Sequence, residues 1–429
     1  MLHHIPLTTI STALPGILDS PLIQKSRDNT IICYDLDYLK ERILYIQSLF
    51  PNALHALALK ACPLPKVLKI VKSLGVGAEA ATFPELYIAE NCGFAPRKIV
   101  FDSPAKTTGE LSYALDLGIH LNIDSFSEMN RIIDLLKNRS TRSRFGLRIN
   151  PQIGQGKIAI TSTTGDYSKF GVPIDEFCEE IRQAFYDYPW LTGVHLHIGS
   201  QGYPVDQLVQ GVQKVYNFVE ETNRWLAGKF TKNRIKIFDI GGGFPVTYHK
   251  DREPPSMELY RDQLRQKCPG LFTGKYRVIT EFGRSVFTNA GWTASRVEYI
   301  KEYCNTITAV IHVGADLLMR RCYFPQDWHH DFSVLDSHGM IKKCHRLRKY
   351  NIVGPLCFSG DILARDIELP EINPGDYIII HDTGGYTLSM WSRHLSRQIP
   401  VVIGYSDNGK KRQLLKRRET PEDLWHFWQ

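Results

Sequence analysis

A short apolar run, a polar or glycine-rich break and a stretch with helical spacing recur from about residue 50 to residue 290. The helical spacing is seen in Val67, Ile70, Val71 and Leu74, which recur at the interval of one helix face. The eight apolar runs are Ala53–Lys60, Val76–Thr82, Ile99–Ser103, Leu121–Ser125, Phe145–Asn150, Gly193–Ser200, Ile235–Gly241 and Val278–Gly283. Strands that alternate with helices predict a parallel sheet, and eight strands close a (β/α)8 barrel. An open doubly wound sheet is the alternative, and the pattern favours the barrel.

The pattern of apolar and polar residues changes after residue 290. The runs Thr306–Val313, Tyr350–Val353 and Asp376–His381 are short, rich in β-branched residues and bounded by turn residues such as those at 373–376, which is typical of strands. We therefore predict a (β/α)8 barrel over 46–290 and a β-rich C-terminal domain over 291–429. The segment 1–45 is expected to add a strand near Thr30–Tyr34 to the β domain.

Composition changes this picture little. Apolar residues make up 43% and charged residues 23% of the 429 residues, and the net charge is +7, as in an ordinary globular enzyme. The basic run at 410–418 is interpreted as a solvated edge, so no nucleic-acid partner is expected. Nine cysteines without a CxxC pair suggest neither a disulfide framework nor a metal site. With no signal-peptide pattern and no membrane span, we expect a cytoplasmic protein.

Side chains able to carry chemistry stand near the ends of the predicted barrel strands. In barrels the carboxyl ends of the strands face the active site. The residues there are Lys60, Glu79, Arg148, His197, Ser200, the glycines Gly241, Gly242 and Gly243, Glu281 and Arg284. This set suits an anionic, aromatic cofactor that bears an aldehyde.

Lys60 and the glycine triplet each allow two interpretations. Lys60 follows an apolar run, and it is either a surface side chain with a buried stem or a desolvated amine able to form a Schiff base. The glycines form either a plain tight turn or a backbone cradle for a phosphate.

The histidines His195 and His197 and the glutamate Glu281 also allow two interpretations each. By strand alternation His195 and His197 share one face; His195 is expected to be a satisfied core histidine, and His197 an imidazole that lies flat on a pyridine ring. Glu281 either forms a plain ion pair with Arg284 or faces a pyridine nitrogen, where it would keep the ring protonated and a strong electron sink.

These motifs resemble those of the fold-type III decarboxylases that depend on pyridoxal 5′-phosphate (PLP), the family of ornithine, arginine and diaminopimelate decarboxylases. The resemblance runs from about residue 30 to 405, and the diaminopimelate decarboxylase branch looks most similar. The motifs that carry it are Ala58–Ala61, His195–Ser200, Asp239–Phe244, Glu281–Ser285, Gly354–Cys357 with Asp361, and Gly384–Met390. Each is weak alone, but their order and spacing are specific together.

The resemblance implies a role for each site residue. Lys60 would hold PLP, His197 would stack on its ring, and Cys357 would return a proton to the carbanion. The other implied cofactor contacts are Glu79, Arg148, Ser200, Gly242, Gly243, Glu281 and Tyr386. The implied substrate contacts are Arg284, Tyr323, Phe358 and Asp361.

The implied activity is decarboxylation of an amino acid of the diaminopimelate or diamino-acid type, with loss of CO2 through a quinonoid intermediate. The resemblance also implies a homodimer with shared active sites, because Cys357 and Asp361 would come from the second subunit.

The sequence departs from the family pattern at Glu79, where Asp is usual, and at Phe282, where Pro is usual. Phe358 stands where diaminopimelate decarboxylases usually carry a Glu for the distal amino group of the substrate. An unpaired ammonium in a buried site is costly, so a related diamino acid is expected. Arg320 and Arg321 lie roughly where that branch has an arginine for the distal carboxylate.

Two other functions compete. An amino-acid racemase on the same fold would place an arginine against the pyridine nitrogen, and Glu281 argues against it. A catalytically silent, decarboxylase-like binding protein would have lost cofactor residues, whereas Lys60, Cys357 and Tyr386 are all present.

Overall fold

The computed structural model describes residues 4–165, 168–229, 231–343 and 346–429, and it divides into two compact units. The barrel unit comprises 43–246 and 254–285, and the sheet unit comprises 1–42, 247–253 and 286–429. Cysteines in the described ranges are free, and Cys344 lies outside them. In the described part of the chain, no helix is long and apolar enough to cross a membrane.

The barrel unit contains the predicted closed parallel barrel. Its strands are hydrogen-bonded in the order β5, β4, β3, β2, β10, β9, β8, β6, and pairing of β5 with β6 closes the ring. The strands are β2 (Leu54–Ala58), β3 (Gly77–Ala80), β4 (Ile99–Phe101), β5 (His120–Ile123), β6 (Arg144–Asn150), β8 (Leu191–His195), β9 (Ile237–Asp239) and β10 (Arg277–Thr280), with a short β7 (Val172–Pro173) beside β6. Each of the eight apolar runs overlaps one barrel strand, although β5, β6, β8 and β10 begin one or two residues before their runs. The (β/α)8 prediction is confirmed.

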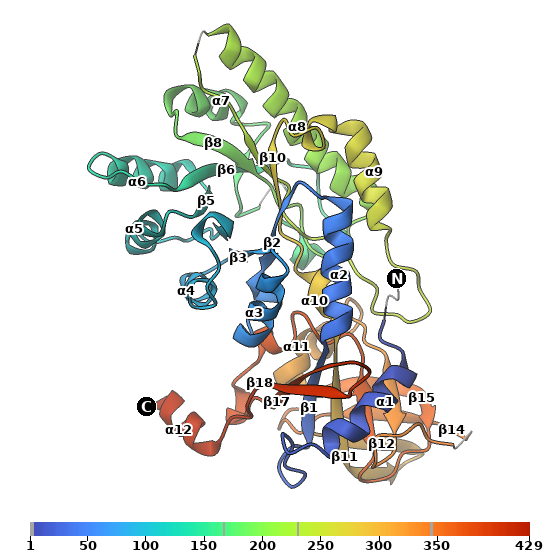
Figure 1. Cartoon of the computed structure of the whole chain (residues 1–429). Coiled ribbons are helices and arrows are strands. Elements are labelled where there is room, and N and C mark those ends of the chain that lie inside the picture. The colour runs from blue at the N-terminus through green and yellow to red at the C-terminus, as the bar shows by residue number, and fades with distance from the viewer. Residues whose placement is uncertain (1–3, 166–167, 230, 344–345) are drawn as a thin grey trace. The chain divides into compact units, whose positions relative to one another are not determined.

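Helices connect the strands and surround the barrel (Figure 1). They are α3 (Pro65–Ser73), α4 (Phe83–Asn91), α5 (Thr108–Leu117), α6 (Phe126–Leu136), α7 (Cys178–Asp187), α8 (Val205–Gly228) and α9 (Met257–Lys267). Several begin at a side-chain cap: Thr107 and Glu110 form a capping box on α5, and Ser125 caps α6. Such caps satisfy amide groups that have no partner inside the helix. They fix where the loops before α5 and α6 end.

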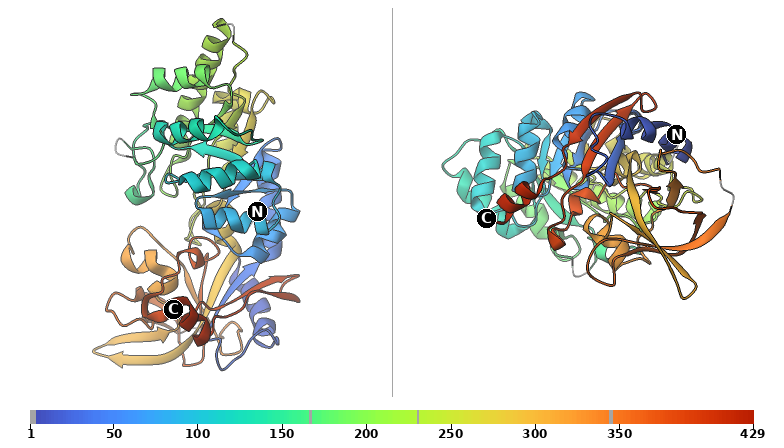
Figure 2. Two further views of the ribbon diagram at one scale, coloured as in Figure 1. Left: turned by 90° about the vertical axis from the view of Figure 1, so that its left-hand side faces the viewer. Right: turned by 90° about the horizontal axis from the view of Figure 1, so that it is seen from below.

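The sheet unit is built on a mixed nine-stranded sheet. The central path runs β15, β14, β12, β11, β1, β17, β18, and β16 pairs with both β11 and β13. The strands are β1 (Thr30–Asp35), β11 (Gly291–Tyr303), β12 (Thr306–Ile311), β13 (Phe332–Leu335), β14 (Leu347–Val353), β15 (Ile362–Pro370), β16 (Tyr377–Ile380), β17 (Val401–Ser406) and β18 (Lys411–Lys416). The predicted β-rich domain is confirmed, and Figure 2 shows its long β11–β12 hairpin from two sides.

The core of the sheet unit lies between the sheet and helix α1 (Leu7–Leu18). Ile10, Leu14 and Ile17 lie on one face of α1 and are fully buried against the sheet, as the helical period requires. On the sheet side Trp292 donates its indole N–H to the Tyr405 hydroxyl at 3.0 Å. The remaining helices are α2 (Leu36–Leu49), α10 (Arg284–Phe287), α11 (Ala315–Tyr323) and α12 (Pro421–Trp428).

Candidate functional site

Lys60 lies just beyond strand β2, in a 3-10 turn formed by Leu59–Ala61. Its Nζ donates to both carboxylate oxygens of Glu79, at 2.9 and 3.0 Å. Glu79 is fully buried on β3, and burial raises its pKa to about 8 although the Lys60 ammonium opposes the shift. The amine therefore stands at the strand ends with a buried acid as its partner.

His197 lies beyond β8, which ends at His195. The prediction that both histidines share one strand face is wrong, because strand alternation does not continue into the loop. The amide of Gly242 donates to His197 Nδ1 at 3.1 Å, which makes that nitrogen an acceptor in a neutral ring. Burial, with the Lys60 charge added, lowers the pKa of His197 to about 3. Thr163 donates its hydroxyl to the His197 carbonyl.

The glycine triplet turns tightly around this loop. Gly241 and Gly243 have φ of +67° and +81°, a region that glycine adopts without strain. A Cβ on Gly242 would lie 2.3 Å from the Glu281 carbonyl oxygen, and one on Gly243 would lie 1.7 Å from that of Gly199. Both positive φ and close backbone contact require glycine here.

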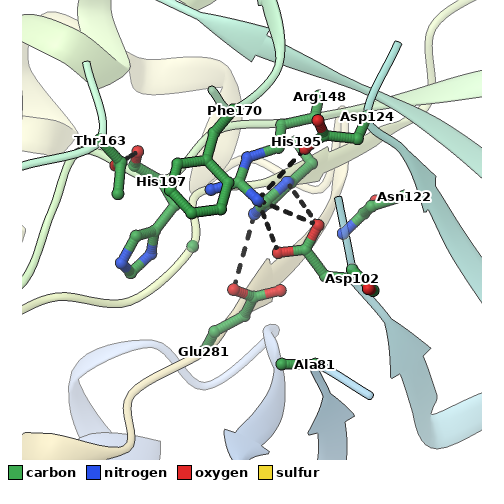
Figure 3. Close-up of polar contacts among 12 residues, drawn as sticks. Ala81, Asp102, Asn122, Asp124, Arg148, Thr163, Phe170, His195, His197 and Glu281 are labelled. Atoms are coloured by element: carbon green, nitrogen blue, oxygen red, sulfur yellow. Dashed lines mark hydrogen bonds and ion pairs between the residues drawn. The ribbon is translucent and has the colours of Figure 1, made fainter. Parts of the chain in front are cut away.

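Glu281 follows β10 and lies against a buried histidine (Figure 3). Its Oε2 is 3.5 Å from His195 Nε2, and the other ring nitrogen, Nδ1, is 3.6 Å from Asp102 Oδ1. His195 is completely buried. Burial alone would raise the pKa of Glu281, but the His195 charge outweighs it and holds the pKa below its usual value.

Arg148 on β6 joins two further acids to this cluster. Its Nη1 is 3.3 Å from Asp102 Oδ2 and 3.5 Å from Asp124 Oδ1, and its guanidinium carbon is 4.5 Å from the centre of the Phe170 ring. Burial opposes ionisation of Asp102, yet the charges of Arg148 and His195 outweigh it, so the pKa of Asp102 is lowered.

Ser200 and Arg284 contact each other directly. Arg284 Nε donates to Ser200 Oγ at 3.0 Å, and the Ser200 amide is held by the Thr161 carbonyl. Arg284 begins α10 and is buried. The barrel unit thus brings several predicted residues together. Lys60 contacts Glu79, and His197 contacts the glycine turn. Glu281 lies next to His195 and Arg148 next to Asp102, and His195 and Asp102 are neighbours.

The sheet unit carries a second group of predicted residues around α11. Arg320 donates to the Tyr386 carbonyl at 2.7 Å and stacks 3.8 Å above the Trp328 ring. Arg321 donates to three backbone carbonyls, those of Leu363, Pro325 and Trp328. These bonds give Arg321 a role in holding its own loop.

Cys357 is exposed on a turn whose shape Asp361 fixes. The buried Asp361 carboxylate accepts from the amides of Leu356 and Ala315, each at 2.7 Å, so it positions the turn; its substrate contact stays a prediction. Phe358 stacks on Tyr323, with ring centres 5.8 Å apart and planes 13° apart. An aromatic pair therefore stands beside the exposed thiol.

Sequence reasoning missed Asp102, Asp124 and Phe170, and treated His195 as core. Asp102 and Asp124 directly follow β4 and β5, so the rule that strand ends carry the site could have found them. Nothing in the sequence marks Phe170, which reaches Arg148 from a long loop.

The barrel residues fit a pyridine-type phosphate cofactor. Glu281 Oε1 is buried without a hydrogen-bond partner among the described residues, and a buried acceptor without a donor is unfavourable. A protonated ring nitrogen would supply that donor. The positive-φ glycine turn is the type of backbone that receives phosphate, and Lys60 places a primary amine at the same end of the strands.

The chain is similar to pyridoxal-dependent decarboxylases over most of its length. A sequence profile described as the pyridoxal binding domain of pyridoxal-dependent decarboxylases matches residues 36–288. Diaminopimelate decarboxylase of Helicobacter pylori strain J99 is 30% identical over 409 residues, 92% of this chain and 94% of that protein. The enzyme of Aquifex aeolicus is 29% identical over 90% of this chain and 88% of its own. The crystal structure of the Helicobacter pylori enzyme complexed with L-lysine has a TM-score of 0.82 at 28% identity, covering 94% of this chain and 98% of that one.

Replacing Gly243 with alanine should lower the melting temperature more than the same change at Gly274. Both glycines have φ near +80°, but nothing lies within 4 Å of a Cβ on Gly274. Gly274→Ala therefore measures the backbone strain alone, about 1–2 kcal/mol, and Gly243→Ala adds the collision with Gly199. Thermal unfolding of both variants beside the parent protein measures the difference; equal melting temperatures would contradict the close packing.

Proposed function

The chain belongs to the pyridoxal-dependent decarboxylase family, and we propose that it decarboxylates an amino acid of the diaminopimelate or diamino-acid type. The observation that carries the proposal is the convergence of the Lys60 amine, the glycine turn and the Glu281 oxygen at one end of the barrel, an oxygen that accepts no hydrogen bond from the residues the structure describes. The relatives named diaminopimelate decarboxylase, and the one solved with L-lysine, support this substrate type.

Six residues of the barrel unit would hold the cofactor. Lys60 would bind its aldehyde carbon, and the amides of Gly242 and Gly243 with the Ser200 hydroxyl would bind its phosphate. His197 would lie against the ring, and Glu281 would accept a hydrogen bond from the ring nitrogen. Tyr386 is proposed as a further phosphate contact. When bound, PLP supplies an electron sink for the pair left by CO2.

The protein residues control protons around this sink. Neutral His197 can pack on a cationic ring without charge repulsion, and Glu281 as an anion keeps the ring nitrogen protonated. Glu79 pairs with the Lys60 amine before the cofactor binds, which keeps the amine oriented in a buried site. Burial raises the pKa of Glu79 while the Lys60 charge opposes the rise, so loss of that charge would raise the pKa further and favour uptake of a proton by Glu79.

We assign the return of a proton to the substrate carbon to Cys357. The thiol is exposed and lies beside the Tyr323–Phe358 pair. We propose that it acts in the site of a second subunit, so that the enzyme is a homodimer with shared active sites.

Phe358 is proposed to set the substrate. Its ring and that of Tyr323 offer no acceptor group for a distal ammonium except the Tyr323 hydroxyl. A diamino acid whose distal nitrogen is uncharged or held elsewhere suits this pair, because an ammonium without an acceptor loses its hydration at a cost.

Lys60→Ala should abolish both the aldimine absorbance of the purified protein and its release of CO2 from amino acids. Without the amine no covalent attachment forms. Absorbance spectra, and mass spectrometry after borohydride reduction, locate the label. Lys69→Ala, at an exposed side chain of helix α3, is the control. A reduced label at another lysine would refute the assignment.

Cys357→Ala should lower kcat by about 100-fold or more, the usual contribution of a general acid, and leave the absorbance unchanged. Cys304→Ala, at another exposed cysteine of the sheet unit, should have no effect. An equal mixture of Lys60→Ala and Cys357→Ala subunits should recover about a quarter of the parent activity if sites are shared in a twofold dimer. Unchanged kcat in Cys357→Ala would remove its role as proton donor.

Phe358→Glu should raise kcat/KM for diaminopimelate by about tenfold or more, since a hydrogen bond to a charged group contributes about 1.5–3 kcal/mol. Phe427→Glu, an exposed aromatic of the same unit, serves as the control for added charge. CO2 release from a panel of diamino acids measures the effect, and no gain for diaminopimelate would show that Phe358 does not decide the substrate.

A further inference from the structure

His195 is a buried histidine whose two ring nitrogens both face carboxylates. Nδ1 lies 3.6 Å from Asp102 and Nε2 lies 3.5 Å from Glu281, and the side chain has no exposed surface. The donor atoms of the three groups all lie within 4.8 Å of one another. Figure 3 shows the dashed contacts that run from this ring toward Glu281 and Asp102.

We infer that His195 is a positioning residue that carries a proton on each ring nitrogen and thereby keeps Glu281 ionised opposite the cofactor ring. The inference rests on the proposed function, because Glu281 matters to the reaction only if PLP binds there. It does not rest on any contact between His195 and the cofactor.

The geometry disfavours a neutral ring between two anions. A neutral imidazole has one N–H and one lone pair, so one of its nitrogens would point a lone pair at a carboxylate oxygen. The Arg148 charge keeps Asp102 ionised. The alternative to a doubly protonated His195 is therefore a neutral His195 with the proton on Glu281. The question is which of these two groups holds one proton.

The surrounding charges favour the proton on His195. Five buried carboxyl groups lie at this end of the barrel, namely Glu79, Asp102, Asp124, Asp239 and Glu281. The cations near them are Lys60, Arg148 and Lys106, and Lys106 also pairs with Glu128. A further cation reduces the mutual repulsion of these acids.

The elements packed around His195 present both kinds of charge. Asp102 follows β4, Asp239 lies on β9 and Glu281 follows β10, and these carboxyl groups favour protonation. Arg148 lies on β6 as a nearby cation, and His197, beyond β8, is neutral. Burial also opposes it, yet the nearby carboxylates outweigh burial and raise the pKa of His195 to about 9.

His120 offers a matched control. It is also buried in the barrel, but it bonds to the neutral Asn122 amide at 3.0 Å, and burial lowers its pKa to about 4. Two buried histidines of one barrel should therefore hold opposite protonation states at neutral pH.

The first test uses the full-length protein labelled with 15N at histidine, before and after addition of PLP. The signal lost in His195→Gln should carry a proton on both nitrogens at pH 7.5, and the signal lost in His120→Gln on one. A single protonated nitrogen at His195 would overturn the inference. This readout does not need PLP, so a protein that fails to bind PLP would refute the proposed function and leave the inference measurable.

The second test compares kcat and the cofactor absorbance of His195→Gln with those of the parent enzyme between pH 6 and 9. Loss of the neighbouring cation should raise the pKa of Glu281, so kcat should fall by on the order of tenfold at low pH. Activity should recover as pH rises, with KM nearly unchanged and the absorbance changing over the same range. A pH-independent loss would indicate a merely structural role and overturn the inference, and His120→Gln should keep the parent profile.

Discussion

The structure depends on a balance of buried charge at one end of the barrel. Acids from β3, β4, β5, β9 and β10 meet there, and isolated buried carboxylates are strongly unfavourable. Arg148 is shared between Asp102 and Asp124, Lys60 pairs with Glu79, and His195 lies between Asp102 and Glu281. Each cation therefore has two effects. It offsets the charge of a buried carboxylate, and it influences the pKa of a group in the site.

Barrel closure makes this balance possible. Parallel strands place all of their carboxyl ends at one end of the sheet, and closure between β5 and β6 turns that edge into a ring. Acids far apart in sequence thus come within a few ångströms of one another. The glycine turn lies at the same end of the barrel. The Gly242 amide donates to His197 and favours its neutral form, and the Gly242 backbone lies close to that of Glu281.

The two units present different kinds of side chain. The barrel unit presents the groups suited to the cofactor, and their partners are mainly charged or backbone groups. The sheet unit presents aromatic rings around Cys357, with Asp361 holding the turn and Arg321 holding its loop. The matched family profile covers residues 36–288, most of them in the barrel unit, whereas Phe358 lies in the sheet unit.

The sequence by itself determined the barrel, the β-rich unit and most of the polar residues that meet at the strand ends. Apolar periodicity gives strands and helices, and the position of Lys60, the glycines and Glu281 at strand ends gives the chemistry. Tertiary structure alone decided that β8 ends at His195, that this histidine lies between Asp102 and Glu281, and that Asp361 holds a turn. Protonation depends on distances between groups from different strands, and local sequence does not contain those distances.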